Sequence, residues 1–117
     1  MTNNDAQPQL LFHIAEHDRW KACVDSGKYS PASLATEGFI HCSYERQVQR
    51  SLDKFFASHD EVILLEIDPV LLRSGLKVEP ADGDSFPHIY GEINTDAVVV
   101  AELIIRDGNS RLTFNGR

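Results

Sequence analysis

EGFIHCS, residues 37–43, is the stretch of sequence that decides the fold. Side chains alternate between the two faces of a β-strand, and the alternation here puts three of them together: Phe39, His41 and Ser43. Imidazole is costly to bury without a hydrogen-bonding partner. A histidine in the middle of this strand therefore indicates a packed side chain with a partner, a metal ligand or a group that handles a substrate.

The next segment, YERQVQRSLDKFFA (44–57), has the clearest helical pattern in the chain. Its apolar residues recur at helical spacing: Tyr44, Val48, Leu52, Phe55 and Phe56. We predict that Val48, Leu52 and Phe55 pack into the main core. Ser43 comes just before this helix and suits the N-cap, where its hydroxyl would accept a hydrogen bond from a backbone amide.

The rest of the chain supplies mostly strands. Working outward, we predict strands at 10–15, 61–68, 76–81, 86–93, 97–106 and 110–114, a helix at 16–27, a connection at 28–36 and a loop at 81–85. The run AVVVAELIIR (97–106) is apolar enough for a central strand covered on both faces, and Asp107-Gly108-Asn109 is a turn signal after it. The order βαβα followed by strands predicts an α+β domain with two early helices packed on a largely antiparallel sheet.

The composition narrows the function. The chain has 117 residues, enough for one domain, which we place at 10–117 after a disordered N-terminal tail at 1–9. Its net charge of −7 argues against nucleic acid as a partner. No apolar run approaches the roughly 20 residues of a membrane span, and the polar first residues do not form a secretory signal. We expect a cytoplasmic monomer that binds a small molecule, with Cys23 and Cys42 reduced.

Three histidines lie inside predicted strands: His13, His41 and His88. At neutral pH imidazole donates, accepts or changes charge. The alternation of each strand turns His13 away from Phe12 and Ile14, and puts His88 on the same face as Tyr90. This is the pattern of a shared polar pocket on one side of the sheet, and also that of a solvated sheet face. We predict that the three histidines face one cleft, and that the other two, His17 and His59, face solvent.

Four other possibilities for the site concern Cys42, Glu92, a bound metal and Ser43. Cys42 is next to His41, but neighbours in a strand point to opposite faces, so the two do not form a thiolate–imidazole pair. Glu92 is either a carboxylate of the pocket or a surface charge. The isolated histidines lack the close spacing of zinc ligands, and we expect no structural metal. Ser43 at a helix start beside His41 is either a plain N-cap or part of an anion site.

These motifs resemble a known family. The FHIA start, the Trp20 helix, EGFIHCS with its helix ending in FF, the ILLEID strand and the FPHIYG block are similar to the bacterial family called domain of unknown function nine-five-two. The resemblance runs from about Leu11 to Ile105. That family is grouped with the ADP-ribosyltransferase-like folds, which bind NAD or ADP-ribose in a cleft of a split sheet.

The resemblance implies a role for each candidate residue. His13 matches a histidine that holds a ribose in those folds, and His41 and Ser43 fall in the pocket. FPHIYG matches the position of their catalytic glutamate, where this chain has His88. A carboxylate stabilises positive charge on the ribose, whereas a histidine acts as an acid or base. The resemblance thus implies the fold and the pocket, and leaves transferase or hydrolase activity open.

The interpretation that unites these observations is an ADP-ribosyltransferase-like split sheet whose cleft binds a nucleotide, NAD or an ADP-ribose derivative. If the chain is an enzyme, His13 would position a ribose hydroxyl, and His41 and His88 would be the acid–base groups. Phe39, Ser43 and Tyr90 would contact the ligand. Two alternatives stay open at this point: a non-catalytic module that recognises a small molecule or a protein, and a metal-assisted hydrolase built on the three histidines.

Overall fold

The structure is a computed structural model that describes residues 9–116, so the predicted tail, apart from Gln9, lies outside the described residues. The strands are β1 (Leu11–Ala15), β2 (Lys28–Tyr29), β3 (Ile40–His41), β4 (Glu61–Ile67), β5 (Gly75–Ala81), β6 (Asp84–Tyr90), β7 (Ile93–Asn94) and β8 (Val98–Ile105). The helices are α1 (His17–Cys23), α2 (Ala32–Glu37) and α3 (Val48–Phe55), with single 3-10 turns at 24–26, 45–47 and 95–97.

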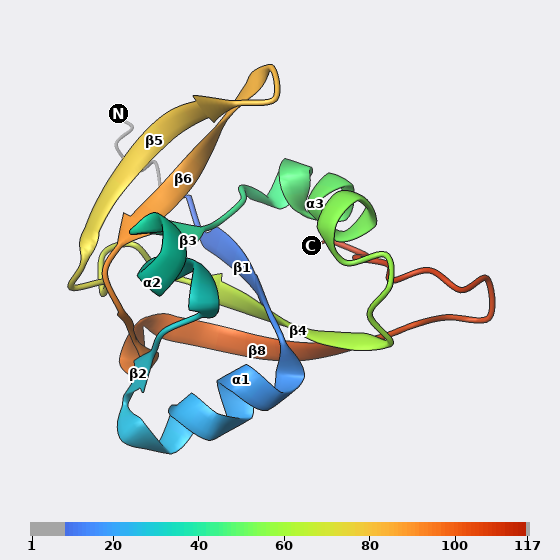
Figure 1. Cartoon of the computed structure of the whole chain (residues 1–117), viewed down its shortest axis with the longest axis horizontal. Helices are drawn as coiled ribbons and strands as arrows, with labels where there is room; N and C mark the ends of the chain where they lie inside the picture. Colours follow the sequence, from blue (N-terminus) through green and yellow to red (C-terminus); the bar gives the residue numbers. More distant parts are fainter. Residues whose placement is uncertain (1–8, 117) are drawn as a thin grey trace, which may run out of the picture.

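The strands form three small antiparallel sheets, with the orders β1-β4-β8, β2-β7 and β3-β6-β5. Figure 1 shows the β5–β6 hairpin at the top, the β1-β4-β8 sheet below it and α3 to the right. The predicted α+β class is confirmed. No helix among residues 9–116 has the length and apolarity needed to cross a membrane.

Each face of the β1-β4-β8 sheet carries its own hydrophobic cluster. Because side chains alternate along a strand, odd-numbered residues of β1 and β4 face one cluster, which includes Leu11, Leu65 and the partly buried Trp20 of α1. Even-numbered residues face the other cluster, in which Phe12 and Leu64 pack against Val48 and Leu52 of α3. The sheet is therefore buried on both sides along its first two strands.

The two larger sheets meet at one pair of residues and then separate. Phe12 N–H donates to Ser43 O at 2.8 Å, and Ser43 N–H donates to Phe12 O at 2.7 Å. Beyond this pair β1 continues along β4 while β3 continues along β6. The result is a fork between β1 and β3, and the candidate site lies in this fork.

The β5–β6 hairpin turns at Asp82-Gly83, where the sequence predicted only a loop over 81–85. Ala81 pairs with Asp84, and the two residues between them have φ values of 52° and 77°. Two positive φ values in a two-residue loop define a type I′ turn, for which Asp-Gly is a preferred sequence. The turn fixes the register of the whole hairpin, down to Gly75 opposite Tyr90.

Helix α2 forms where the sequence predicted only a connection at 28–36. Pro31 is its N-cap, with φ −73° and ψ 164°, and Gly38 ends it in the left-handed region at φ 87°. A proline near the first turn and a glycine just past the last are typical helix signals. With only six residues between them, the helix is too short to show a periodic apolar stripe.

Strand β8 lies at the edge of its sheet, so the prediction of a central, doubly covered strand is wrong. Val99, Leu103 and Ile105 are 49%, 46% and 61% exposed. A continuous apolar run predicts a strand, but the strand's place in the sheet depends on pairing with distant segments.

The segment 110–114 is not a strand, although it was predicted as one. The side-chain amide of Gln49 in α3 supplies the two hydrogen bonds that a neighbouring strand would have made. Its Nε2 donates to Leu112 O at 2.9 Å, and its Oε1 accepts from Phe114 N–H at 2.8 Å.

The stripe of α3 is confirmed for Val48 and Leu52, which are 0% and 1% exposed, and wrong for Phe55, which is 62% exposed. Helix α3 ends at Phe55, and the next residue, Phe56, leaves the helical conformation with φ −125° and ψ 16°. Phe56 thereby turns back onto the cluster in place of Phe55.

Ser43 is not the N-cap of this helix. A 3-10 turn (Glu45–Gln47) precedes α3, and Tyr44 caps it. Ser43 is buried instead, and its hydroxyl is 3.1 Å from the hydroxyl of Ser51.

Candidate functional site

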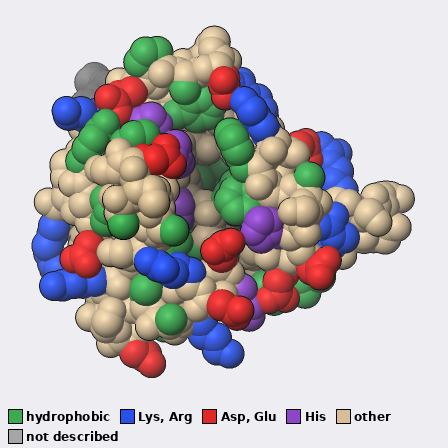
Figure 2. Space-filling model, in the orientation of Figure 1, with side chains coloured by type: hydrophobic (Ala, Val, Ile, Leu, Met, Phe, Trp, Pro, Cys, Tyr) green, Lys and Arg blue, Asp and Glu red, His purple; other side chains and the backbone are tan. Residues whose placement is uncertain are grey.

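A cleft of about 760 Å³ opens in the fork between β1 and β3. His13, His41 and His88 all line it, so the structure brings the three strand histidines together. Figure 2 shows the hollow near the centre of the molecule, with histidine side chains along its left side. Among the predicted ligand-binding residues, Phe39 and Ser43 also line the cleft, whereas Tyr90 is not part of its lining.

His13 is held by two hydrogen bonds within the protein. Its Nδ1 is 2.7 Å from His41 O, and its Nε2 is 3.1 Å from the hydroxyl of Tyr29. A carbonyl oxygen only accepts, so Nδ1 carries the proton and donates to it. In the neutral ring Nε2 is then an acceptor, and the Tyr29 hydroxyl donates to it.

Burial keeps this pair uncharged. Desolvation lowers the pKa of His13 from 6.5 to about 4, and the hydrogen bond to His41 O opposes that effect only in part. Desolvation also raises the pKa of the Tyr29 hydroxyl. Alternation turns His13 away from Phe12 and Ile14, as predicted, but both faces of β1 are buried. His13 faces the cleft because β1 forms one side of the fork.

The main chain of β1 also faces the cleft. In an antiparallel pair the residues that exchange hydrogen bonds alternate along each strand. Phe12 turns its N–H and C=O toward Ser43, so Ile14 turns its own N–H and C=O the same way, where β3 has already diverged. Ile14 lines the cleft, and no hydrogen bond between its main chain and another described residue occurs on this side. The fork thus presents one donor and one acceptor side by side.

His41 lies at the mouth of the cleft. Its side chain is 54% exposed, and its Nε2 is 3.1 Å from Oε1 of Glu37 at the end of α2. An exposed pair of this kind adds little stability. His41 is opposite His88 across the β3–β6 ladder, and the two rings meet edge to face with centroids 5.5 Å apart.

His88 is 7% exposed and is paired with a carboxylate. Its Nδ1 is 2.8 Å from Oε1 of Glu79, and the same oxygen accepts the hydroxyl of Tyr90 at 2.5 Å. These two hydrogen bonds, Tyr90 first, lower the pKa of Glu79. The ring of Phe39 stacks on His88 at 4.3 Å with an angle of 25° between the planes. Tyr90 lies outside the lining and contacts two neighbours of His88, Glu79 through its hydroxyl and Phe39 through its ring at 5.4 Å.

Aromatic rings make most of the walls. Every phenylalanine of the chain except Phe114 lines the cleft: Phe12, Phe39, Phe55, Phe56 and Phe86. The charged lining residues are Arg19 and three carboxylates: Glu16, Glu37 and Asp82. This combination suits a planar ring that is neutral or positively charged, because cations are attracted to aromatic faces.

Sequence reasoning missed Tyr29 and Glu79. Tyr29 precedes a Ser-Pro signal in a two-residue strand, and nothing in its neighbourhood points to His13. Glu79 had a usable signal: an Asp82-Gly83 hairpin turn pairs residue 77 with residue 88, which places Glu79 diagonally opposite His88. Glu92, the other interpretation of which was a pocket carboxylate, is exposed, accepts a hydrogen bond from the Ser30 hydroxyl and does not line the cleft.

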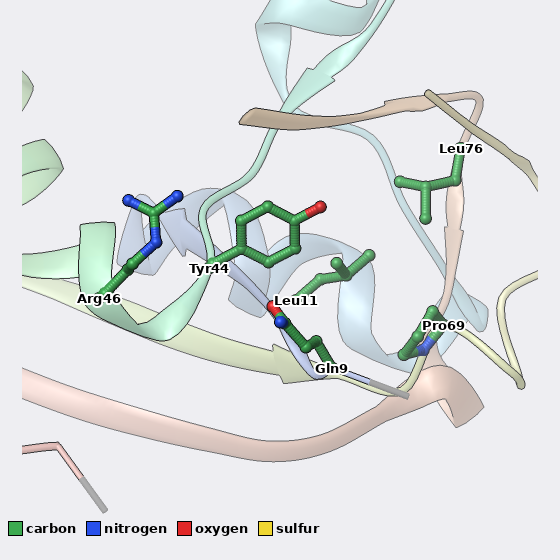
Figure 3. Close-up of a pocket in the computed structure, with 6 residues that line it drawn as sticks. All are labelled: Gln9, Leu11, Tyr44, Arg46, Pro69 and Leu76. Carbon is green, nitrogen blue, oxygen red and sulfur yellow. The ribbon is translucent and has the colours of Figure 1, made fainter. Parts of the chain in front are cut away.

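The predicted anion site at the helix start is divided between two hollows, because His41 and Ser43 line the cleft. Tyr44 and Arg46 of the first turn line a separate hollow of about 420 Å³, together with Gln9, Leu11, Pro69 and Leu76 (Figure 3). Tyr44 N–H already donates to Oε1 of Gln47, and Arg46 is bound to Asp84 at 2.8 and 3.1 Å. Tyr44 N–H and the Arg46 guanidinium therefore already have partners within the protein.

The remaining histidines and the cysteines have structural surroundings. His17 pairs with Glu61 and His59 with Glu16, and both histidines are half-buried rather than solvent-facing. Cys23 and Cys42 are free thiols, and burial raises the pKa of Cys42. Within residues 9–116, no group of three His, Cys, Asp or Glu side chains is placed to hold a metal ion.

The fold and the cleft together define a small α+β domain with a histidine-lined fork between two antiparallel sheets. The chain belongs to the family described as "Protein of unknown function (DUF952)", which it matches over residues 14–101. The predicted family is thereby confirmed. The grouping with ADP-ribosyltransferase-like folds stays a prediction.

Two solved structures of protein CC0527 from Caulobacter crescentus are similar to this chain. The crystal structure has 26% sequence identity and a TM-score of 0.80, and the similarity covers 89% of this chain and 93% of that one. The solution NMR structure has 26% identity and a TM-score of 0.76, with 89% and 91% covered. No curated protein matches the chain.

Proposed function

We propose that the cleft binds a nucleotide-type small molecule, NAD or an ADP-ribose derivative. The observation that carries this proposal is the open main chain of Ile14 in a fork walled by phenylalanines. A strand edge with a free N–H and C=O pairs with any planar group that has a donor and an acceptor side by side. A carboxamide and the edge of an adenine ring are such groups.

The walls supply the stacking surface for such a ring. Stacking of a base on an aromatic side chain contributes about 1–3 kcal/mol. Phe55 lines the cleft and is 62% exposed, so its ring is accessible to a ligand there. The carboxylates Glu16 and Glu37 at the cleft favour a cationic ring such as a nicotinamidium over an anionic one.

The length of the cleft fits a ligand larger than a single ring. Ile14 is on β1 and His88 is on β6, with β3 between them. Adjacent strands are about 4.8 Å apart, so these two groups lie at least roughly 10 Å apart along the fork. A ring bound at Ile14 with a sugar attached would extend toward His41 and His88. Arg19 is the cation of the lining that would meet a phosphate, although its Nε already donates to Ser30 O.

Titration followed by NMR tests this proposal. With NAD, ADP-ribose or nicotinamide, amide shifts should concentrate on Ile14, on Phe39 to Ser43, and on Phe86 and His88. Phe55→Ala should weaken binding of the same ligand about tenfold, the equivalent of roughly 1.4 kcal/mol of stacking. Val78→Ala, at an exposed apolar residue outside the cleft lining, should leave the affinity unchanged. Absence of shifts at millimolar concentrations of all three ligands would contradict the proposal.

A non-catalytic binding module is the second candidate, and one observation favours it. Both ring nitrogens of His13 have protein partners, so this histidine holds the fork and does not offer a nitrogen to a ribose. Ligand binding without release of any product from NAD would support this candidate.

A further inference from the structure

Hydrogen bonds join Glu79, His88 and Tyr90 into one unit at the side of the cleft. Glu79 lies behind His88, outside the lining of the cleft, while His88 itself lines the cleft. A carboxylate bonded to one nitrogen of an imidazole leaves the other nitrogen for the ligand side. In this arrangement Nδ1 faces Glu79 and Nε2 is the nitrogen available to the cleft.

The protonation state of the ring follows from its partner. An ionised carboxylate only accepts hydrogen bonds, so Nδ1 of His88 donates to Glu79. The hydrogen bonds from Tyr90 and His88 lower the pKa of Glu79, which keeps that carboxylate ionised at neutral pH. In the neutral ring Nε2 then carries a lone pair and no proton. Among the described residues, no hydrogen bond occupies this nitrogen.

The His88 ring is held at one face by a stacked ring and at its Nδ1 edge by the Glu79 carboxylate. Phe39 stacks on one face of His88 at 4.3 Å, and Tyr90 fixes the position of the carboxylate behind it. The charged and titratable groups around the ring are Glu79 and Lys77 of β5, and His41 of β3 with its Glu37 partner. A fixed ring with one bare nitrogen toward a cleft has the geometry of a general base.

We infer that His88 is the general base of a hydrolytic reaction in this cleft, with Glu79 as its positioning residue. This inference rests on the proposed binding of NAD-type ligands and adds the reaction. Nε2 takes a proton from a water molecule, whose oxygen forms a bond to the sugar carbon that holds the ring. The bond from that carbon to the ring nitrogen breaks, and its electron pair stays with the nitrogen.

The mechanism uses one general base and no general acid, and this determines the class of substrate. A leaving group that departs as an anion needs a general acid to protonate it. A cationic N-linked ring needs none, because it leaves neutral once it has taken the electron pair. The carboxylates Glu16 and Glu37 and the aromatic walls favour the same cationic ring. The products are the neutral ring, the sugar with a new hydroxyl, and a proton that passes from His88 to solvent.

His88→Asn separates the reaction from binding, because the asparagine amide can still donate to Glu79 in place of Nδ1 while Nε2 is lost. With NAD as the probe, the wild-type protein should release nicotinamide. The variant should bind NAD with unchanged NMR shifts at Ile14 and release nicotinamide at least 100-fold more slowly, the lower end of what a general base contributes. Val78→Ala, at an exposed residue of β5 outside the cleft lining, serves as the matched control and should release nicotinamide at the wild-type rate.

Nitrogen NMR of the imidazoles tests the role of Glu79 without any substrate. At pH 8 the wild-type His88 should be protonated at Nδ1 and bare at Nε2, and Glu79→Ala should abolish that fixed tautomer. His88 protonated at Nε2 in the wild type, or equal turnover by His88→Asn, would overturn the inference. Binding of NAD without release would also overturn it and leave the proposed function standing. Absence of NAD binding by the wild type would overturn the substrate and the proposed function together.

Discussion

The neutral state of His13 predicts a pH dependence of stability that one substitution removes. The pKa of His13 is about 4 in the folded chain and about 6.5 in the unfolded chain. Between these values the unfolded chain binds the proton and the folded chain does not. Stability is therefore complete above pH 6.5, falls as the pH is lowered, and levels off near pH 4.

The size of the effect follows from the separation of the two pKa values. They differ by about 2.5 units, and each unit corresponds to about 1.36 kcal/mol, so the wild type should lose roughly 3 kcal/mol from this residue between pH 6.5 and 4. His13→Asn keeps a donor toward His41 O and has no titrating group. Leaving the Tyr29 hydroxyl without its acceptor should cost the variant about 1–3 kcal/mol at pH 7.

Urea unfolding of both proteins at pH 7, 6, 5 and 4 measures the prediction. Carboxylates and the other histidines titrate in both proteins, so the difference between the two free energies of unfolding isolates His13. The stability of the wild type relative to the variant should fall by roughly 3 kcal/mol from pH 7 to pH 4, so that at pH 4 the variant is as stable as the wild type or more stable. A difference that stays constant over this range would refute a buried neutral His13. An NMR titration of the ring with a midpoint near 6.5 would refute it too.

Two further predictions concern the fold. Leu52→Ala, at a residue 1% exposed in α3, should destabilise the chain by about 2–5 kcal/mol in urea unfolding, whereas Phe55→Ala, at 62% exposure, should cost less than about 1 kcal/mol; equal losses would contradict the placement of α3. Gly83→Ala introduces a side chain at φ 77° in the I′ turn and should cost about 1–2 kcal/mol, although no atom lies within 4 Å of the new methyl group. Gly75→Ala, with equal space and no positive φ, is its control and should be close to neutral.

The sequence predicted the elements that carry a strong local signal. The apolar stripe located α3, and the runs at 10–15 and 61–68 located β1 and β4. The failures involve information that is not local. Whether Phe55 or Phe56 is buried depends on the residue at which the helix ends. Whether β8 is central or at an edge depends on which strands pair, and the apolar sequence of a strand does not identify the strands that pair with it.

The site was predictable in part for the same reason. Alternation along three strands predicted that the histidines converge, and they do. Their partners come from elsewhere in the chain: Tyr29 is 16 residues from His13, and Glu79 is 9 residues from His88. Only the pairing of Glu79 with His88 could be predicted from the sequence, because an Asp-Gly turn fixes the register of its hairpin.

The fork explains why a histidine stands in β1. If β1 and β3 kept pairing beyond Phe12 and Ser43, Ile14 would lie opposite His41, and Ile14 N–H would donate to His41 O. In the structure Nδ1 of His13 satisfies that carbonyl instead, at 2.7 Å. One side chain thus replaces the ladder hydrogen bond that the separation of the strands removes, while the N–H and C=O of Ile14 are left for a ligand. If the two strands stayed paired, β3 would take up the N–H and C=O of Ile14 and there would be no cleft. Because the strands separate, a bound molecule can form the hydrogen bonds that β3 would have formed with Ile14.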